Sequence, residues 1–168
     1  MQVPRVAGVY ELQVGLRMES EGSGSEPILG SPFDVETLPG ETFAQESEAL
    51  GGHGNCDPED LVPCPGTDYG ISGHNSTFII RAFDAHKNRR RVGGDVWKIV
   101  VYNPDFPNEY SLGSFMDHGD GLYTAFVAPT RAGRNTLLVT LDSVPIKGAP
   151  FQMDVFPGEF SQSMSSLS

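Results

Sequence analysis

A duplicated block is the feature of this chain that most constrains its fold. Residues 28–33 (ILGSPF) recur 118 positions later as residues 146–151 (IKGAPF), and residues 7–16 (AGVYELQVGL) recur at an offset of 125 as residues 132–141 (AGRNTLLVTL). The seven extra residues of the first copy lie in the polar linker between its two blocks, where a longer loop costs little because closure entropy grows only logarithmically with length. A repeat at this spacing indicates two tandem units that end in the same way.

Each copy predicts a pair of strands. Leu12, Val14 and Leu16 alternate with polar residues or glycine, which is the period of a strand with one buried face, and residues 137–141 repeat the pattern. The proline of each second block opens a further strand, where its missing N–H costs least. Because an isolated pair of strands is marginally stable in water, we expect residues 1–40 to be the C-terminal strands of a preceding, incomplete repeat.

The rest of the chain predicts one complete unit over residues 41–158. Seven short strands are expected at residues 43–50, 76–84, 95–102, 110–116, 122–127, 137–141 and 151–155. The pair Asp120-Gly121 between alternating segments is a strong hairpin signal. No helical segment stands out, so the pattern predicts an all-β, immunoglobulin-like antiparallel β-sandwich of about seven strands. The Ser-rich residues 159–168 are expected to form a flexible tail.

Five segments, in this order, resemble the filamin-type immunoglobulin repeat: residues 78–84 (FIIRAFD), 91–95 (RVGGD), 117–123 (DHGDGLY), 128–133 (APTRAG) and 146–151. The resemblance covers residues 41–158, with residues 7–40 as the tail of a preceding repeat. It implies a scaffolding segment that binds neighbouring repeats and other proteins in a cytoskeletal or ciliary assembly.

The sequence departs from the family pattern at two places. Asn135 replaces the usual aromatic residue, which Tyr10 keeps in the first copy, so a weaker corner is expected there, and the connection from Gly51 to Gly73 is long.

Composition and motifs exclude several classes of function. The net charge of −11 argues against a nucleic-acid or anionic-lipid surface, and the basic run at residues 87–91 is interpreted as a solvated loop. No stretch approaches the ~20 apolar residues that span a bilayer, and the first residues carry no signal-peptide pattern. No nucleophile elbow, metalloprotease or phosphate-loop motif is present. We therefore expect no enzyme activity, no cofactor and no metal, and this chain gives no direct support for actin binding.

The long connection holds the two cysteines and is followed by a glycosylation sequon. Cys56 and Cys64 could form a disulfide, remain free thiols, or bind zinc with His53 and His74, although their spacing is not that of a zinc knuckle. Asn75 begins the triplet Asn-Ser-Thr. A bridged Cys56–Cys64 pair and a glycan on Asn75 would favour an alternative function, that of an extracellular adhesion or recognition module.

The pair Asp117 and Asp120, next to His118, could suggest calcium binding or acid–base chemistry. A calcium site needs six or more converging oxygens, and the turn explains Asp120-Gly121 without an ion. We interpret these residues as a structural turn.

The strand at residues 95–102 carries the candidate binding site. The charge of Lys98 disfavours burial of the strand face that carries it. Trp97, Ile99 and Val101 on the other face are therefore expected in the core. Their alternation partners then face outward, and the partner-binding edge is predicted at Val96, Lys98, Val100 and Tyr102. Resemblance to filamin-type repeats implies that this third strand borders a groove shared with the fourth, an edge where a partner can add a β-strand. The competing interpretation is that residues 103–109 or a neighbouring repeat cover the edge.

Overall fold

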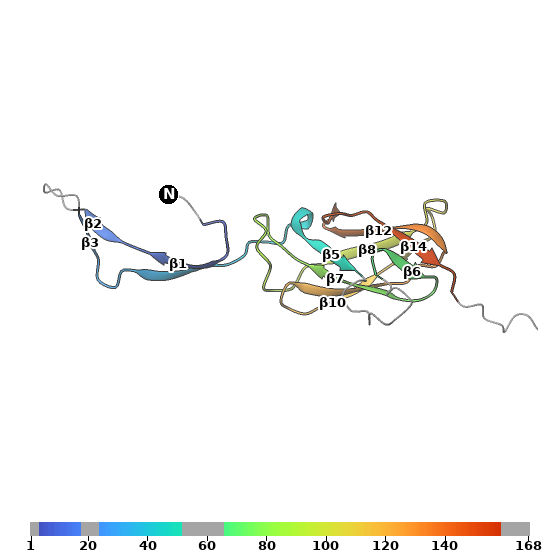
Figure 1. The fold of residues 1–168 in the computed structure, drawn as a ribbon, viewed down its shortest axis with the longest axis horizontal. Coiled ribbons are helices and arrows are strands. Elements are labelled where there is room, and N and C mark those ends of the chain that lie inside the picture. Colours follow the sequence, from blue (N-terminus) through green and yellow to red (C-terminus); the bar gives the residue numbers. More distant parts are fainter. Residues whose placement is uncertain (1–3, 18–23, 52–65, 159–168) are drawn as a thin grey trace, which may run out of the picture.

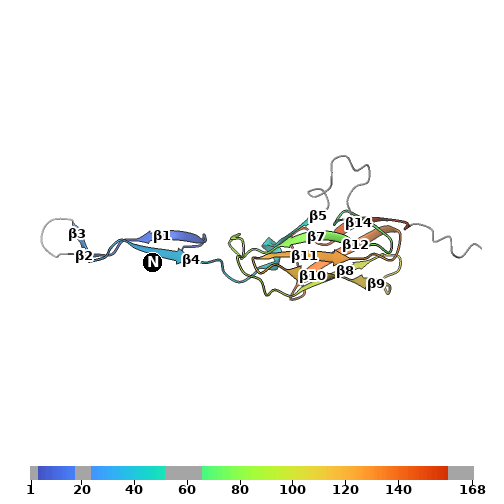
Figure 2. The ribbon, with the colours of Figure 1, turned by 90° about the horizontal axis from the view of Figure 1, so that it is seen from below.

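The computed structural model of the chain describes residues 4–17, 24–51 and 66–158. A two-layer sandwich forms most of it, and a long hairpin projects from one end of the sandwich (Figures 1 and 2). The hairpin contains β1 (Gly8–Leu12) paired with β4 (Phe33–Thr37) and β2 (Gly15–Arg17) paired with β3 (Ser25–Pro27). No helix among the described residues is long and apolar enough to cross a membrane.

Two sheets form the sandwich. The first has the order β10-β11-β7-β5, made by Ser114–Asp117, Leu122–Val127, Ser76–Arg81 and Glu48–Gly51. The second has the order β6-β14-β12-β8-β9, made by Tyr69–Ile71, Phe151–Phe156, Gly133–Leu141, Trp97–Tyr102 and Tyr110–Leu112, and β13 (Val144–Pro145) also pairs with β12. A short 3-10 helix, η1, spans Ala44–Glu46. The predicted all-β sandwich is confirmed.

Alternation along the strands builds the core, as the sequence predicted. Trp97, Ile99 and Val101 of β8 are at most 4% exposed, while Lys98 between them faces solvent. They meet the buried positions of the opposite sheet, of which Phe78 and Tyr123 are the largest. Full burial of each large apolar side chain stabilises the fold by about 1.5–3 kcal/mol, so these positions fix which face of each strand points inward.

Tyr123 combines core packing with a partly buried polar contact. Its ring meets Trp97 edge to face, at 5.5 Å between ring centroids. Its hydroxyl donates to Asp95 Oδ2 at 2.7 Å, and Thr42 donates to the same oxygen. Burial and the hydrogen bond to Asp95 raise the pKa of Tyr123. This contact ties the segment before β8 to the centre of the other sheet.

Several predicted strands differ from those observed. The expected strand at 43–50 begins as η1 and becomes β5 only at Glu48. The expected strand at 110–116 is two strands in different sheets, β9 and β10, because the chain crosses between the sheets at Gly113. A Cβ on Gly113 would lie 2.6 Å from Ile99 Cγ2 and 2.7 Å from the carbonyl oxygen of Phe126, so the crossing needs glycine. The short strands β6 and β13 were not predicted.

The hairpin repeats the pairing of β12 with β14 and β13. Tyr10 faces Val35 as Asn135 faces Met153, and all five residue pairs of β1 and β4 correspond to pairs of β12 and β14 at the two sequence offsets. Ile28 donates to the carbonyl of Val14 as Ile146 donates to that of Val139. The duplication in sequence is therefore a duplication in structure.

Asn135 replaces the hydrogen bond that the tyrosine makes in the first copy. The Tyr10 hydroxyl donates to the carbonyl of Val6, four residues earlier, at 2.6 Å. Asn135, which is 2% exposed, donates from Nδ2 to the carbonyl four residues before it, that of Arg131, at 2.9 Å, and also to that of Gly133. The amide thus makes the bond that the phenol makes in the first copy, and the weaker corner stays a prediction.

A buried carboxylate joins the hairpin segment to the sandwich. Asp84, which is 3% exposed, accepts hydrogen bonds from the backbone N–H groups of Gly40, His86 and Asn88 and from Asn88 Nδ2, all at 2.8–2.9 Å. Burial alone would raise the pKa of this carboxyl, but the hydrogen bonds, those from Asn88 foremost, lower it from 3.8 to about 2. The ionised carboxylate therefore fixes both the turn at residues 84–88 and the linker at Gly40.

Asn88 extends this contact to the hairpin itself. Its Oδ1 accepts the N–H of Ala7 and its Nδ2 donates to the carbonyl of Arg5, both at 2.8 Å. Arg91 also lies 3.6 Å from a carboxylate oxygen of Glu36 on β4. The hairpin is thus hydrogen-bonded to the turn between β7 and β8.

Candidate protein-binding face

The strand β8, which the sequence predicted as the third strand of the sandwich, is not an edge strand. It lies between β12 and β9, and Val100, Val101 and Tyr102 pair with Leu112, Ser111 and Tyr110 of β9. Gly113 continues this contact by donating to the carbonyl of Ile99 at 2.9 Å. The predicted position of the edge is therefore corrected: the chain after β8 folds back as β9 and covers that strand, so among the described residues the sheet ends at β9.

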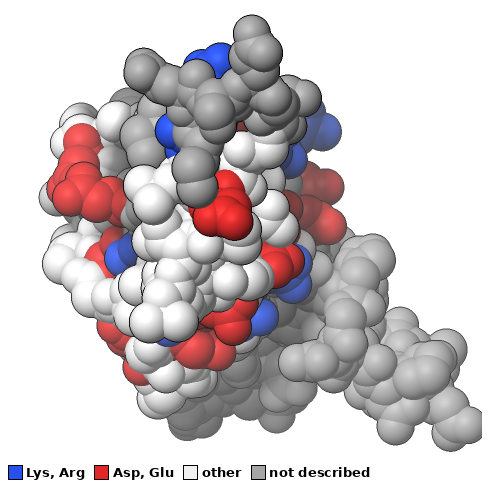
Figure 3. Space-filling view, turned by 90° about the vertical axis from the view of Figure 1, so that its left-hand side faces the viewer, with Lys and Arg blue, Asp and Glu red and all other residues white. Residues whose placement is uncertain are grey.

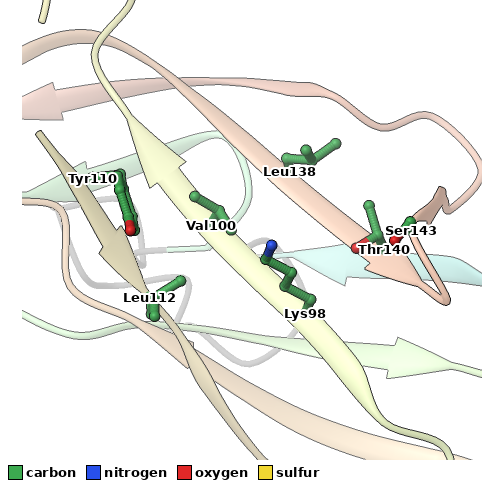
Figure 4. Close-up of a pocket in the computed structure, with 7 residues that line it drawn as sticks. All are labelled: Lys98, Val100, Tyr110, Leu112, Leu138, Thr140 and Ser143. Atoms are coloured by element: carbon green, nitrogen blue, oxygen red, sulfur yellow. The ribbon is translucent and has the colours of Figure 1, made fainter. Parts of the chain in front are cut away.

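A hollow of about 460 Å³ lies on the outward face of this sheet. Figure 4 shows that its lining comes from three neighbouring strands and the turn after them: Lys98 and Val100 of β8, Tyr110 and Leu112 of β9, Leu138 and Thr140 of β12, and Ser143. Tyr110 is 59% exposed and Leu112 is 64% exposed. The lining combines an apolar centre with one cation, and it borders the free edge of the sheet.

Two of the four predicted edge residues line this hollow. Lys98 and Val100 do, whereas Val96 lies before β8 and is 75% exposed, and Tyr102 is half-buried opposite Tyr110. Sequence reasoning missed Leu112 and Leu138. A signal for Leu138 was present, because it follows the core residue Leu137 directly and two adjacent apolar residues in a strand must face opposite sides.

Polar and aromatic contacts hold the connection between β8 and β9, residues 103–109. Arg131 makes two hydrogen bonds to the Glu109 carboxylate, at 2.7 and 2.9 Å, and its guanidinium lies 3.9 Å from the ring centroid of Phe106. The hydrogen bond from Arg131 lowers the pKa of Glu109. Within the connection, Phe106 donates its N–H to the carbonyl of Asn103. These contacts place β9 beside β8.

The acidic turn beside β10 uses its carboxylates to hold its own backbone. Asp117 accepts the N–H groups of Gly119 and Gly94, and Asp120 accepts that of Leu122. His118 Nε2 lies 2.7 Å from the hydroxyl oxygen of Thr124. These bonds match the interpretation of a structural turn.

Two predicted sites remain, the glycosylation sequon at Asn75 and the cysteine pair. Asn75 is exposed in the connection between β6 and β7, followed by the buried Ser76 and the exposed Thr77. Cys56, Cys64 and His53 lie outside the described residues, so the disulfide stays a prediction.

The sequence model of the filamin/ABP280 repeat matches residues 55–152. The chain belongs to this family. Its repeats are structural domains that mediate protein–protein interactions, and their immunoglobulin-like fold is typically non-catalytic. The fold of this filamin repeat is similar to that of the Lin-41 filamin domain, with 19% sequence identity, a TM-score of 0.51, and coverage of 73% of this chain and all of that one. The resemblance to filamin repeats, and the immunoglobulin-like fold that it implied, are confirmed.

Two further similarities extend beyond filamin domains. The flagellar outer-arm dynein alpha chain of Chlamydomonas reinhardtii is 38% identical over 87 residues, which are 48% of this chain and 2% of the dynein chain. The Escherichia coli adhesin FdeC shares the fold with a TM-score of 0.54 and 17% identity, over 92% of this chain and 42% of that structure. The match to the dynein chain thus concerns one small module within a very long protein.

Proposed function

We propose that this filamin repeat is a non-catalytic scaffolding segment that binds a partner protein at the outward face of β8, β9 and β12, in a cytoskeletal or ciliary assembly. The observation that carries the proposal is the hollow around Val100 and Leu112. It is mostly apolar and borders the edge of β9, which has no second partner strand in the part of the chain that the structure describes. Exposed apolar surface beside an unpaired strand edge is the surface that an added β-strand covers.

The occupant we propose is an extended peptide segment that pairs with β9. Backbone groups of β9 would supply hydrogen bonds, while alternate apolar side chains of the partner would contact Leu112 and Val100. An acidic residue in the partner would meet Lys98, the cation of the hollow. This mode differs from addition to β8, because β9 already pairs with Val100 to Tyr102.

The ciliary setting is supported by the similarity to the flagellar dynein chain, which at 38% identity matches about half of this chain. Because the match covers only a small part of that motor protein, it supports the presence of the same kind of module in both proteins. The host protein and its partner remain parts of the proposal.

Peptide selection tests the proposed face directly. A phage-displayed library of random 12-residue peptides is selected on the immobilised chain, and each enriched peptide is measured against the wild type, Val100→Glu and Leu112→Glu. Both substitutions place a charge in the hollow and are expected to weaken binding at least about 10-fold, a loss of about 1.4 kcal/mol.

Met116→Glu is the matched control, because Met116 is 57% exposed on β10 of the other sheet. The proposed binding face would be refuted if the enriched peptides bind the wild type and all three variants equally. It would also be refuted if they shift amide resonances only in residues outside β8 and β9.

A second function is favoured by one observation, the exposure of Asn75 in its sequon. An oligosaccharide transferase needs an accessible asparagine, and this position offers one next to an exposed threonine. We propose as the alternative an extracellular adhesion or recognition module with a Cys56–Cys64 bridge. Intact mass of the native protein, before and after deglycosidase and reductant, decides: unmodified Asn75 and two free thiols reject the alternative.

A further inference from the structure

The hairpin at residues 8–37 exposes the face that its structural copy buries. Leu12, Val14 and Leu16 are 47%, 37% and 66% exposed, whereas their counterparts in β12, Leu137, Val139 and Leu141, are at most 8% exposed. On the second strand Val35 is 41% exposed, while its counterpart Met153 is fully buried. Figure 3, viewed from the hairpin end, shows uncharged surface there between scattered charged groups.

Three neighbours bury this face in the second copy. The strand β8 pairs antiparallel with β12 along Thr136 to Leu141, and β6 pairs in parallel with β14 along Asp154 to Phe156. The opposite sheet covers the inner side chains. Among the described residues, the hairpin has none of these three neighbours.

The absence of a neighbouring strand coincides with a break in the hairpin. The strand β12 runs without interruption from Gly133 to Leu141, whereas the corresponding stretch is divided into β1 and β2 at residues 13–14. The counterpart of this break, residues 138–139, pairs with Val100 and Ile99 of β8. Pairing with β8 keeps the backbone of β12 extended across this position, and the hairpin is irregular where that pairing is missing.

We propose that the hairpin is a strand acceptor, completed into a second sandwich by polypeptide that lies N-terminal to it in the host protein. The topology of the complete unit gives the direction, because β5 to β11, which cover β12 and β14, all precede β12 in the chain. This inference goes beyond the proposed binding face, which lies on β8 and β9 and does not depend on it.

The register defines what the donor strands contact. One donor pairs antiparallel along residues 11–16, and its inward side chains lie opposite Leu12, Val14 and Leu16, as those of Val101, Ile99 and Trp97 lie opposite the β12 residues. A second donor pairs in parallel along residues 36–38, as β6 does along β14. The donors are therefore apolar, alternating strands of the same immunoglobulin-like kind.

Amide hydrogen exchange tests the proposal. The chain is compared with a longer chain that also carries the roughly 90 residues encoded immediately before Met1, enough for the remaining strands of such a domain. Amides of β1 and β4 are expected to exchange roughly 100-fold more slowly in the longer chain, since protection follows the stability of the unit that must open. Amides of β12 and β14 are expected to stay unchanged.

A pair of substitutions locates the contact. Leu12→Asp is expected to leave the short chain unchanged and to restore fast exchange of β1 and β4 in the longer chain. Val9→Asp is the matched control, because Val9 is 70% exposed and its counterpart Arg134 faces solvent, so it should be neutral in both.

Four results would overturn the proposal. The first is that β1 in the short chain is already protected as strongly as β12, and the second is that the longer chain adds no protection. The third is a host gene in which no coding sequence precedes Met1. The fourth is protection that rises with protein concentration, because a second copy would then cover the face. Each leaves peptide binding at β9 unaffected, so the two proposals fail separately.

Discussion

Substitution of Asp84 by asparagine provides a quantitative test of how the turn at residues 84–88 is held. The side chain keeps its shape, but the neutral amide retains one acceptor oxygen, while its NH2 group then faces N–H groups. The lowering of the Asp84 pKa from 3.8 to about 2 corresponds to about 2 kcal/mol, at ~1.4 kcal/mol for each pKa unit. We expect the substitution to reduce the free energy of unfolding at pH 7 by at least about this amount.

Urea unfolding followed by tryptophan fluorescence measures the loss. Trp97 is the single tryptophan and lies in the core, so its signal reports the sandwich. With a denaturant slope of roughly 1–2 kcal/mol/M, the midpoint is expected to fall by about 1–2 M. Asp154→Asn is the control, because its carboxylate is 68% exposed and lies 3.9 Å from Arg134.

The pH dependence gives the sign of the effect. Because the folded-state pKa of Asp84 lies below its unfolded value, the ionised carboxylate stabilises the fold fully above about pH 4, and this contribution is lost as the pH falls toward 2. The difference between wild type and Asp84→Asn should therefore shrink over this window. Equal midpoints at pH 7, or a difference that stays constant down to pH 2, would refute the reasoning.

Three further substitutions test the packing of the sandwich by urea unfolding. Gly113→Ala should destabilise by about 1–3 kcal/mol, because its Cβ would overlap Ile99 at the crossing between the sheets; an unchanged midpoint would mean that the crossing relaxes freely. Tyr123→Phe keeps the ring but removes the donor to Asp95, at a cost of about 1–2 kcal/mol, and a cost near zero would show that water replaces the hydroxyl. Asn135→Ala should cost about 0.5–1.5 kcal/mol, since it removes the donor of two part-buried hydrogen bonds; a neutral result would show that the corner needs no side-chain bond.

The alternation of apolar and polar residues predicted the strands that have one buried face and one exposed face. The alternation around Trp97 identified the core face of β8 because a charged Lys98 cannot take the inward position. The duplicated blocks identified the hairpin because both copies keep the same two segments in the same order. These features depend on neighbours within a few residues. They are therefore visible in the sequence.

Features set by distant parts of the chain could not be predicted in this way. The alternation from Tyr110 to Met116 continues across Gly113, and only the packing against Ile99 and Phe126 shows that the chain changes sheets there. The strand β6 has three residues and is defined by its parallel partner β14. The hollow needs three strands side by side, so the sequence could suggest Val100 without indicating that Leu112 would lie next to it.

The position of the joint at Asp84 has a mechanical consequence. The hairpin leaves one end of the sandwich and β14 runs toward the other (Figure 1), so tension along the long axis enters near Gly40 and leaves through β14. The hydrogen bonds from Gly40 and Asn88 to Asp84 lie on that load path, ahead of the β5–β7 ladder. Under tension the hydrogen bonds at Asp84 would carry the force before the strand pairing of the sheet does. They would therefore break first, while the sandwich is still folded.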